Sequence, residues 1–469
     1  MGFISRLHGY DGAAVASDNL SLSWSELMVR VTRGAAALHE AGVGPGSTVG
    51  IAIVDEVEHF VASLSLIASG AWQIALASHD TQAERTEIAE RARVTHLLAG
   101  SPGEPQTGSV PHLQWPLAAV EGADPDEVPE GGVLLRTSGT TGAMNLVPLT
   151  AADLLVQAAR NPEYAGGRLF RPASIEHNNS KRHRLYCAAM GGTNVLRPAG
   201  AVDVVDYCIR HGVTTLDLAL MQAADLAATK RQGLEETDIR VSGSAVPQEL
   251  RARIEENLTR RLHVRYGSTE SGTVSSSGPG EHDPDESVGR IVPGIELEIV
   301  DGEGRPLATG ETGHIRMRGE GIARGYFEGS EQTARRFRDG WYWPGDLGQL
   351  RADGTLRILG RADDMINLNG INIFPSEIER VLEQHPDVLS AAALPLSSAL
   401  HGQIPVAAVE LRSKGAITER ELVAYARERL TLRAPRRVII VPMLPRNSQG
   451  KIVRREIAPL FLGRGRAGD

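Results

Sequence analysis

Several features are scarce in this chain of 469 residues, and each scarcity excludes a class of protein. The two cysteines, Cys187 and Cys208, form no CxxC pair, which excludes a disulfide-rich scaffold and a cysteine-based zinc site. No apolar run reaches the roughly 18 residues of a membrane-spanning helix, and the N-terminal residues lack the apolar core of a secretory signal. The net charge of −9 provides no basic face for nucleic acid. We therefore expect a cytoplasmic protein that binds neither a membrane nor nucleic acid.

The composition is that of a globular protein with more than one domain. Apolar residues make up 41% of the chain and charged residues 23%. A chain of 469 residues exceeds what a single hydrophobic core usually supports. Basic residues are concentrated only in KRHR at 181–184 and RAPRR at 433–437. We interpret each run as a solvated surface or a local phosphate contact.

Helix and strand patterns alternate through the first half of the chain. Ser23 and Glu26 have the spacing of a capping box, and apolar residues then recur at helical intervals up to a predicted C-cap at Gly42. The other expected elements are strands at 50–54, 72–77, 94–99, 193–197 and 214–218, and helices at 57–69, 81–92, 151–160 and 202–211. Strands separated by helices predict parallel βαβ units. A Pro-, Gly- and acid-rich segment at 111–131 interrupts them and is typical of a surface connector.

The second half changes character twice. Between about 289 and 360, short strands alternate with turns such as Asp301-Gly302 and Asp353-Gly354, which predicts a small β-subdomain. The expected elements after it are helices from Pro375, Thr418 and Ile452 and strands at 389–394, 405–411 and 437–441. The predicted fold class is α/β, with a large N-terminal domain of two doubly wound α/β subdomains and a small β-subdomain. A small, mobile α+β C-terminal domain follows it.

Two motifs offer groups suited to phosphates and a cation. TSGTTG at 137–142 follows a strand-like segment, and its hydroxyls and glycines can wrap around phosphate oxygens, although it lacks the P-loop form. An ordinary polar turn is the alternative. YGSTE at 266–270 sets a carboxylate beside a hydroxyl, which suits magnesium, and an aromatic ring that can stack on a base. Taken alone, this motif is equally typical of a surface loop.

Two further motifs lie closer to the C-terminus. Asp346 in GWYWPGD is followed fifteen residues later by Arg361 in GRADD. An aspartate can chelate a ribose diol, and an arginine can pair with it or with phosphate. Lys451 stands in PRNSQGK, a glycine-containing loop directly before an expected helix. A lone lysine is ordinarily exposed to solvent, so this motif gains meaning only beside the others.

Together and in this order, these motifs resemble those of the adenylate-forming superfamily: acyl- and aryl-CoA synthetases, peptide-synthetase adenylation domains and luciferases. The resemblance covers nearly the whole chain, since GRADDMINLNGINIFPSEIE and RNSQGKIVRREI also resemble the family's hinge and C-terminal lysine loop. Stand-alone aryl-acid ligases are the most similar in character. The resemblance implies an N-terminal domain at 1–361 and a C-terminal lid domain at 362–469 that rotates about Asp363.

The resemblance also implies the reaction of an AMP-forming acid–thiol ligase. ATP and a small carboxylic acid would give acyl-AMP and pyrophosphate with the help of Mg²⁺, and the acyl group would then pass to a thiol. No carrier domain follows Lys451, so we expect that thiol to belong to CoA or to the phosphopantetheine of a separate carrier protein. No side-chain nucleophile is needed, and the chain has no G-x-S-x-G elbow.

Each matched residue takes a role from the resemblance. The catalytic residues would be Lys451, which reaches the carboxylate and α-phosphate, Thr269, which contacts phosphate, and Glu270, which holds magnesium. Nucleotide would be bound by Thr137, Ser138, Gly139, Thr140, Thr141 and Gly142 at the triphosphate, by Ser244, Ala245, Tyr266 and Gly267 around adenine, and by Asp346 and Arg361 at the ribose. The acid would lie against His177, Asn178, Gly243 and Gly272.

The substrate is predicted from the start of one helix. His177 and Asn178 resemble the aryl-acid-activating members, in which an asparagine meets the aromatic acid, although Asn178 could equally cap the helix. The Phe-Asp pair with which amino-acid-activating members hold the α-amine is absent. We therefore expect a small, aromatic acid. The next residues, NSKRH at 179–183, fit no pattern.

Two departures from the family pattern motivate an alternative function. The phosphate loop continues with Ala143, Met144 and Asn145 where the family has a lysine, and Asn367 replaces a hinge lysine. A degenerate homologue that binds nucleotide or acyl-adenylate as a sensor or partner protein is therefore the second hypothesis. Retention of the residues matched to magnesium, ribose and adenylation favours the enzyme.

Overall fold

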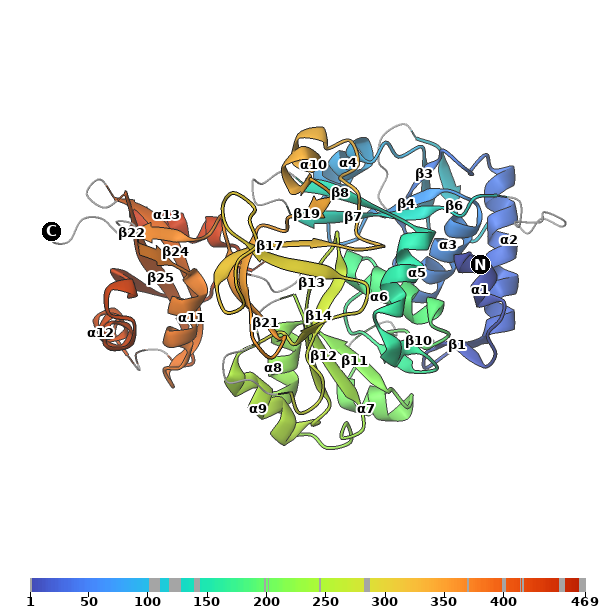
Figure 1. Ribbon diagram of the computed structural model, residues 1–469. Coiled ribbons are helices and arrows are strands. Elements are labelled where there is room, and N and C mark those ends of the chain that lie inside the picture. The colour runs from blue at the N-terminus through green and yellow to red at the C-terminus, as the bar shows by residue number, and fades with distance from the viewer. Residues whose placement is uncertain are drawn as a thin grey trace.

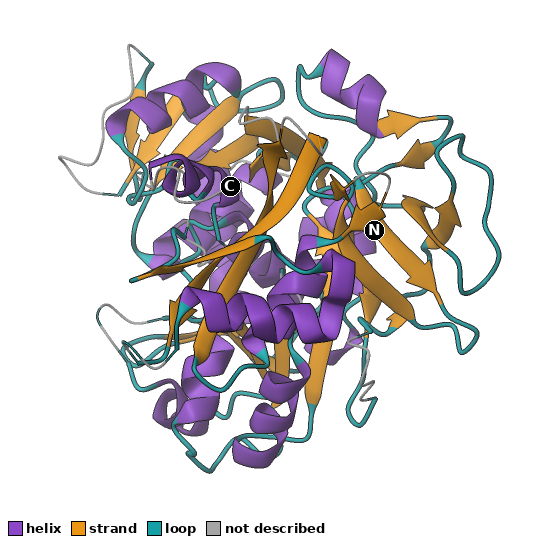
Figure 2. Cartoon of the chain, turned by 90° about the vertical axis from the view of Figure 1, so that its left-hand side faces the viewer, coloured by secondary structure: helices purple, strands orange, loops and turns teal. Residues whose placement is uncertain are grey.

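The computed structural model describes residues 2–100, 110–117, 128–138, 144–197, 200, 202–243, 246–281, 287–368, 371–398, 402–413, 415, 417–446 and 452–463. A large N-terminal part and a small C-terminal part lie end to end (Figure 1). Both parts combine strands with covering helices (Figure 2). This is the α/β fold class that the sequence predicts. No helix within the described ranges is long and apolar enough to cross a membrane.

The first sheet has six strands in the order β6-β5-β3-β4-β7-β8. Its strands are β3 (Thr48–Ala52), β4 (Trp72–Ala75), β5 (His96–Ala99), β6 (His112–Gln114), β7 (Gly132–Ser138) and β8 (Met144–Thr150). All neighbours are parallel except β7 and β8. The connecting helices are α3 (Glu56–Ala68) and α4 (Gln82–Arg91), and α2 (Trp24–Glu40) packs on α3. The capping box of Ser23 and Glu26 that begins α2 is confirmed.

The second sheet has nine strands in the order β15-β14-β13-β12-β11-β9-β10-β1-β2. They are β1 (Ala13–Ala16), β2 (Ser21–Ser23), β9 (Arg168–Phe170), β10 (Thr193–Val195), β11 (Thr215–Leu218), β12 (Asp238–Ser242), β13 (Leu262–Ser268), β14 (Gly272–Ser276) and β15 (Arg290–Ile291). Its central strands are parallel. The accompanying helices are α5 (Ala151–Ala159), α6 (Asn178–Ala189), α7 (Val204–Arg210), α8 (Leu220–Ala228) and α9 (Gln248–Asn257).

Two smaller sheets complete the fold. The predicted β-subdomain contains β16 (Glu296–Val300), β17 (Thr312–Arg318), β18 (Phe337–Arg338), β19 (Trp341–Tyr342), β20 (Asp346–Leu350) and β21 (Leu356–Arg361), with α10 (Ser330–Arg336) beside it. The C-terminal sheet contains β22 (Ile366–Leu368), β23 (Ile371–Ile373), β24 (Val388–Ser398), β25 (Gly402–Leu411) and β26 (Arg437–Val441). Helices α11 (Pro375–Glu383) and α12 (Glu419–Leu430) pack on it, and its core contains no residue before Ile366.

The KRHR run at 181–184 is buried, so its interpretation as a solvated surface is wrong. It forms the second turn of α6, where the exposed fractions are 3% for Lys181, 7% for Arg182, 5% for His183 and 1% for Arg184. Two of these side chains have polar partners that are distant in sequence. Arg184 pairs with Glu56 at 2.6 Å, and Lys181 Nζ donates to Gln73 Oε1 at 3.3 Å. Helix α6 is thereby held against α3 and β4 of the first sheet.

Two other expectations need correction. The segment at 111–131 is more than a surface connector, because His112–Gln114 joins the first sheet as β6 and Trp115 is 3% exposed. Residues 118–127 of this segment lie outside the described part. The helix expected from Ile452 begins only at α13 (Ala458–Gly463). Ile452 instead forms a β-bridge with Arg446, and a 3₁₀ turn at Arg454–Glu456 intervenes.

Because Lys181 is buried, we predict that the free energy of unfolding depends on pH. Burial lowers the pKa of Lys181 from 10.5 to about 7, although Glu176 opposes the shift. Between these pH values the unfolded chain binds more protons than the folded one, so the free energy of unfolding should rise with pH there. Lys181→Met removes this dependence. The stabilisation of the Lys181→Met variant over the natural protein should be largest at pH 7 and shrink toward about pH 10 in urea titrations.

The exposed Lys230 provides the control. Lys230→Met removes an exposed lysine and should change the free energy of unfolding by only a small amount. A difference between Lys181→Met and the natural protein that stays constant from neutral to alkaline pH would contradict the prediction.

Candidate active site

Three of the predicted nucleotide-binding residues meet where the second sheet adjoins the β-subdomain. Asp346 begins β20 and Arg361 ends β21, and the antiparallel pairing of these strands sets the two residues opposite each other. Arg361 Nη1 donates to Asp346 Oδ1 at 3.1 Å, and the Tyr266 hydroxyl, from β13, donates to Asp346 Oδ2 at 2.6 Å. Burial, with the Asp346 charge, raises the pKa of Tyr266 well above 10, so its hydroxyl keeps the proton that it donates.

Glu270 lies in the loop directly after β13 and is 6% exposed. Its Oε1 accepts a hydrogen bond of 2.8 Å from the Tyr326 hydroxyl, and burial, together with Glu270, raises the pKa of Tyr326. No hydrogen bond to Oε2 occurs among the described residues. Tyr326 is not among the predicted site residues, because no sequence motif links it to a glutamate 56 residues away.

Two buried arginines hold the backbone of this loop. Arg182 Nη1 donates to the carbonyl oxygens of Ser268 and Thr269 at 3.0 and 2.9 Å. Arg160 Nη1 donates to the carbonyl oxygen of Ser271 at 2.8 Å, and its Nη2 donates to that of Glu320. The backbone that carries Thr269 and Glu270 is thus fixed by side chains from α6 and from the end of α5. Neither arginine was among the predicted site residues.

The glycines of this region have a structural reason of their own. A Cβ atom on Gly267 would lie 2.1 Å from the carbonyl oxygen of Gly272, so the turn between β13 and β14 requires glycine there. Gly272 has a φ of +70°, which favours glycine. Gly243 also has a positive φ, of +90°, and ends the described part of its loop. These constraints explain Gly267 and Gly272 without any contact to a ligand.

His177 and Asn178 lie beside the end of β7, where the TSGTTG motif begins. Asn178 Nδ2 donates to the carbonyl oxygen of Arg136 at 2.7 Å, and Thr137 follows Arg136. The N-cap position of α6 is His177, and Asn178 is already helical, so the alternative that Asn178 caps the helix is wrong. The His177 ring lies 4.5 Å from that of His79. Burial, with His79 nearby, lowers the pKa of His177 to about 4, so its ring is neutral at neutral pH.

Several predicted residues lie outside the described part of the chain. They are Gly139, Thr140, Thr141, Gly142, Ser244, Ala245 and Lys451. Thr137 and the backbone of Ser138 end β7, where Thr137 pairs with Asn145 of β8. The predicted hinge residue Asp363 is paired with three arginines of the N-terminal part, Arg336 at 3.4 Å, Arg335 at 3.7 Å and Arg361 at 3.8 Å.

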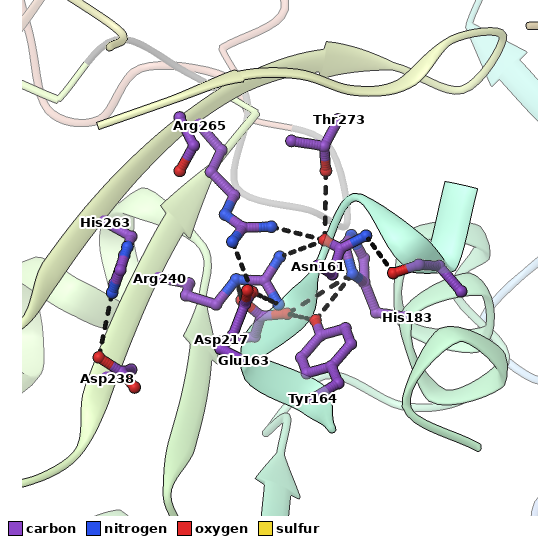
Figure 3. A network of polar contacts seen from close by, with 12 residues as sticks. Asn161, Glu163, Tyr164, His183, Asp217, Asp238, Arg240, His263, Arg265 and Thr273 are labelled. Carbon is purple, nitrogen blue, oxygen red and sulfur yellow. Dashed lines mark hydrogen bonds and ion pairs between the residues drawn. The ribbon is translucent and has the colours of Figure 1, made fainter. Parts of the chain in front are cut away.

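A network of buried charges lies between α6 and strands β11 to β13 (Figure 3). Asp217 accepts from Arg171 and, at 3.0 Å, from the Tyr164 hydroxyl, and it lies 3.2 Å from Arg240 Nε. Glu163 pairs with Arg240 at 3.1 Å and with Arg265 at 2.5 Å. Three guanidinium groups therefore share two carboxylates, which leaves the network with a surplus of positive charge.

Comparison with known proteins decides the family. The family model of the AMP-binding enzymes matches residues 6–327, and that of the AMP-binding enzyme C-terminal domain matches residues 377–451. The chain belongs to the AMP-binding enzyme family. The predicted membership of the adenylate-forming superfamily is thereby confirmed.

Individual relatives agree with this assignment. The chain is 36% identical over 203 residues to the 2-succinylbenzoate–CoA ligase of Geobacillus kaustophilus. The matched region covers 43% of this chain and 41% of that ligase. It is 30% identical to the salicyl-AMP ligase / salicyl-S-ArCP synthetase of Mycobacterium tuberculosis over 93% of this chain and 85% of the relative. The o-succinylbenzoate CoA synthetase of Bacillus subtilis, solved with its acyl-adenylate intermediate, has a similar structure, with a TM-score of 0.86, 25% identity and coverage of 100% and 98%.

The comparisons confirm the fold class, and the relatives are named as CoA ligases and an AMP ligase, in agreement with the predicted enzyme class. Five of the curated relatives are matched over only 6% to 62% of their own length. The acid, the acceptor and the roles of single residues therefore belong to the proposal below.

From the contact between Tyr266, Asp346 and Arg361 we predict that Asp346 contributes to nucleotide affinity. Asp346→Asn should weaken binding of AMP and ATP by about 10- to 100-fold, the order expected when a hydrogen bond to a charged group is lost. Isothermal titration calorimetry measures the dissociation constants. Asp353→Asn, at the exposed turn of the same β20–β21 hairpin, is the matched control and should leave both constants unchanged. Equal affinities for the natural protein and Asp346→Asn would contradict the ribose assignment.

Proposed function

We propose that the protein activates a small, aromatic carboxylic acid with ATP to an acyl-adenylate and then transfers the acyl group to a thiol. The observation that carries this proposal is the meeting of Tyr266, Asp346 and Arg361 beside the buried loop with Glu270. An acidic group for ribose hydroxyls, an aromatic ring for adenine and a carboxylate for a cation then lie in one place.

The chemistry explains why a lysine is needed. A carboxylate that attacks ATP brings two anions together, so a positive charge near the carboxylate and the α-phosphate lowers the barrier. In the proposed reaction, Lys451 supplies that charge. A carboxylate oxygen bonds to the α-phosphorus, and pyrophosphate leaves with the electron pair of the broken P–O bond. The thiol then attacks the acyl carbon, loses its proton to solvent and releases AMP.

Glu270 has the properties of a magnesium ligand. Mg²⁺ in nucleotide sites is typically bound by one or two carboxylates together with substrate phosphates and water. Glu270 offers one such carboxylate, because Tyr326 holds Oε1 and orients the group while Oε2 accepts no bond within the described ranges. Bound there, Mg²⁺ would neutralise charge that develops on the phosphates. No group of three His, Cys, Asp or Glu residues with metal-site geometry occurs in the described part.

The C-terminal domain, residues 362–469, is proposed to rotate about Asp363 between the two half-reactions. Support comes from the separate hydrophobic cores of this domain and from the position of Asp363 between them and the N-terminal part. Asp363 makes three ion pairs, all with arginines, and the side chain of Asp363 is 38% exposed. Arg335, at 54% exposed, makes an exposed pair with Asp363 that contributes little energy, so this pair can be exchanged as the domain turns.

An aromatic acid is favoured by the start of α6 and by the named substrates of the relatives. Asn178 lies at the N-terminal end of α6, beside the neutral ring of His177. Relatives act on 2-succinylbenzoate and form salicyl-AMP, according to their names. The acceptor is proposed to be CoA or the phosphopantetheine of a carrier protein, since relatives of both kinds are matched.

Lys451→Ala tests the proposed chemistry. It should lower the rate of acid-dependent ATP–pyrophosphate exchange by at least ~100-fold, the order lost with one preorganised charge-stabilising donor. The thioester half-reaction started from synthetic acyl-adenylate should survive, because rotation about Asp363 would move Lys451 away from the site. Exchange near the natural rate in the variant would show that Lys451 is not the adenylation lysine.

A panel of acids tests the proposed substrate class. Substituted benzoates and small heteroaromatic acids should have a higher kcat/KM in the exchange assay than long-chain fatty acids or free amino acids. Asn178→Ala should reduce the discrimination among substituted benzoates and spare ATP binding, because a polar side chain rejects analogues that leave it unpaired. A higher kcat/KM for an aliphatic or amino acid than for every aromatic acid would overturn the aromatic assignment and leave adenylation itself intact.

A further inference from the structure

Arg182 is the one member of the KRHR run whose side chain faces the loop of the proposed active site. Asn178 and Arg182 are four residues apart on α6 and therefore lie on the same face of the helix. Arg182 reaches from this face to the carbonyl oxygens of Ser268 and Thr269, directly before Glu270. A molecule held between Asn178 and the Glu270 loop would contact Arg182.

The charge of Arg182 has no carboxylate partner among the described residues. Its hydrogen bonds go to two backbone carbonyls and, at 3.3 Å, to the side-chain oxygen of Asn179. Its Nε–H is buried and donates to no partner among the described residues. The side chain is 7% exposed. A buried charge that is balanced only by dipoles is costly, and an anion beside it lowers that cost.

The neighbouring charges increase the attraction for an anion. Arg171, Arg240, Arg182 and Arg265 all act on His183, whose pKa is well below 6.5, chiefly because of burial and then because of these four arginines. His183 is therefore neutral. The carboxylates within the same network are Asp217 and Glu163, which are shared by Arg171, Arg240 and Arg265. The four guanidinium groups thus outnumber the two carboxylates of this network, and Arg182 is the one that bonds the backbone of the loop.

We propose that Arg182 determines specificity by binding a second anionic group on the substrate acid, so that the enzyme prefers acids that carry a carboxylate besides the one it activates. This inference rests on the proposed function and specifies its substrate class further. The lack of any acidic side chain paired with Arg182 agrees with it, because an acid substrate then supplies the counter-charge. Free amino acids, which bring an ammonium group instead, would be repelled.

A purely structural role for Arg182 is the competing explanation, and Arg160 provides the matched control. Both side chains are buried arginines that donate to carbonyl oxygens of the same loop, Arg182 to residues 268 and 269 and Arg160 to residue 271. Loss of loop positioning should affect every acid equally. Loss of an anion contact should affect only acids with the second charge.

The test compares acids that differ only in that charge. Isophthalate is paired with 3-carbamoylbenzoate, and succinate with succinamate, in acid-dependent pyrophosphate exchange. The natural enzyme should show at least a ~10-fold higher kcat/KM for the dianionic member of its preferred pair. Arg182→Gln should lower that value by about 100-fold, mainly through KM, the order expected when one partner of a buried charge pair is removed. The same variant should lower kcat/KM for the carbamoyl analogue by a clearly smaller factor, which measures the loss of loop positioning common to both acids, and Arg160→Gln should change both acids by the same factor.

Arg182→Lys, which keeps the charge, should retain part of the preference and guards against a variant that fails to fold. An equal loss for both members of a pair in Arg182→Gln, or a natural enzyme that prefers the carbamoyl analogue, would overturn the inference and leave adenylation standing. If no acid supports exchange by the natural enzyme, the proposed function itself fails.

Discussion

The burial of charge in helix α6 is the constraint on which the arrangement of the site depends. Four consecutive basic residues lie between two sheets, and a charge in such a place is tolerated only with close partners. Arg184 finds Glu56 at the start of α3, and Lys181 finds Gln73 in β4. Arg182 instead finds the backbone of the loop after β13. One ion pair and several hydrogen bonds from one helix therefore join the first sheet to the second.

Three parts of the chain contribute to the resulting site. The loop after β13 carries Thr269 and Glu270, the hairpin of β20 and β21 carries Asp346 and Arg361, and α6 carries His177 and Asn178 beside the end of β7. The buried surroundings fix the protonation of the groups between them. Tyr266 and Tyr326 remain protonated hydrogen-bond donors to carboxylates, and His177 remains neutral. A nucleotide would therefore meet groups whose charges are already set.

The sequence predicted those parts of the site that are local or that recur as motifs. Asp346 and Arg361 lie on the two strands of one antiparallel hairpin, so both belong to sequence motifs at a short spacing. The capping box of Ser23 and Glu26 likewise depends only on residues three positions apart. The burial of KRHR could not be predicted, because the partners of Lys181 and Arg184 are more than one hundred residues away and carry no pattern of their own. Tyr326 and Arg160 could not be predicted as site residues for the same reason. Each contacts the Glu270 loop through a hydrogen bond between residues that are far apart in the sequence.

The central claim is that a carboxylate oxygen of the acid attacks the α-phosphorus of ATP. The most direct measurement is the transfer of ¹⁸O from an acid labelled in its carboxyl group, under single turnover with a thiol acceptor, to the nucleotide product analysed by mass spectrometry. Because the bridging oxygen of an acyl-adenylate comes from the acid and leaves with the nucleotide, the account predicts AMP that contains one ¹⁸O atom. Unlabelled AMP, or ADP with labelled phosphate, would contradict it.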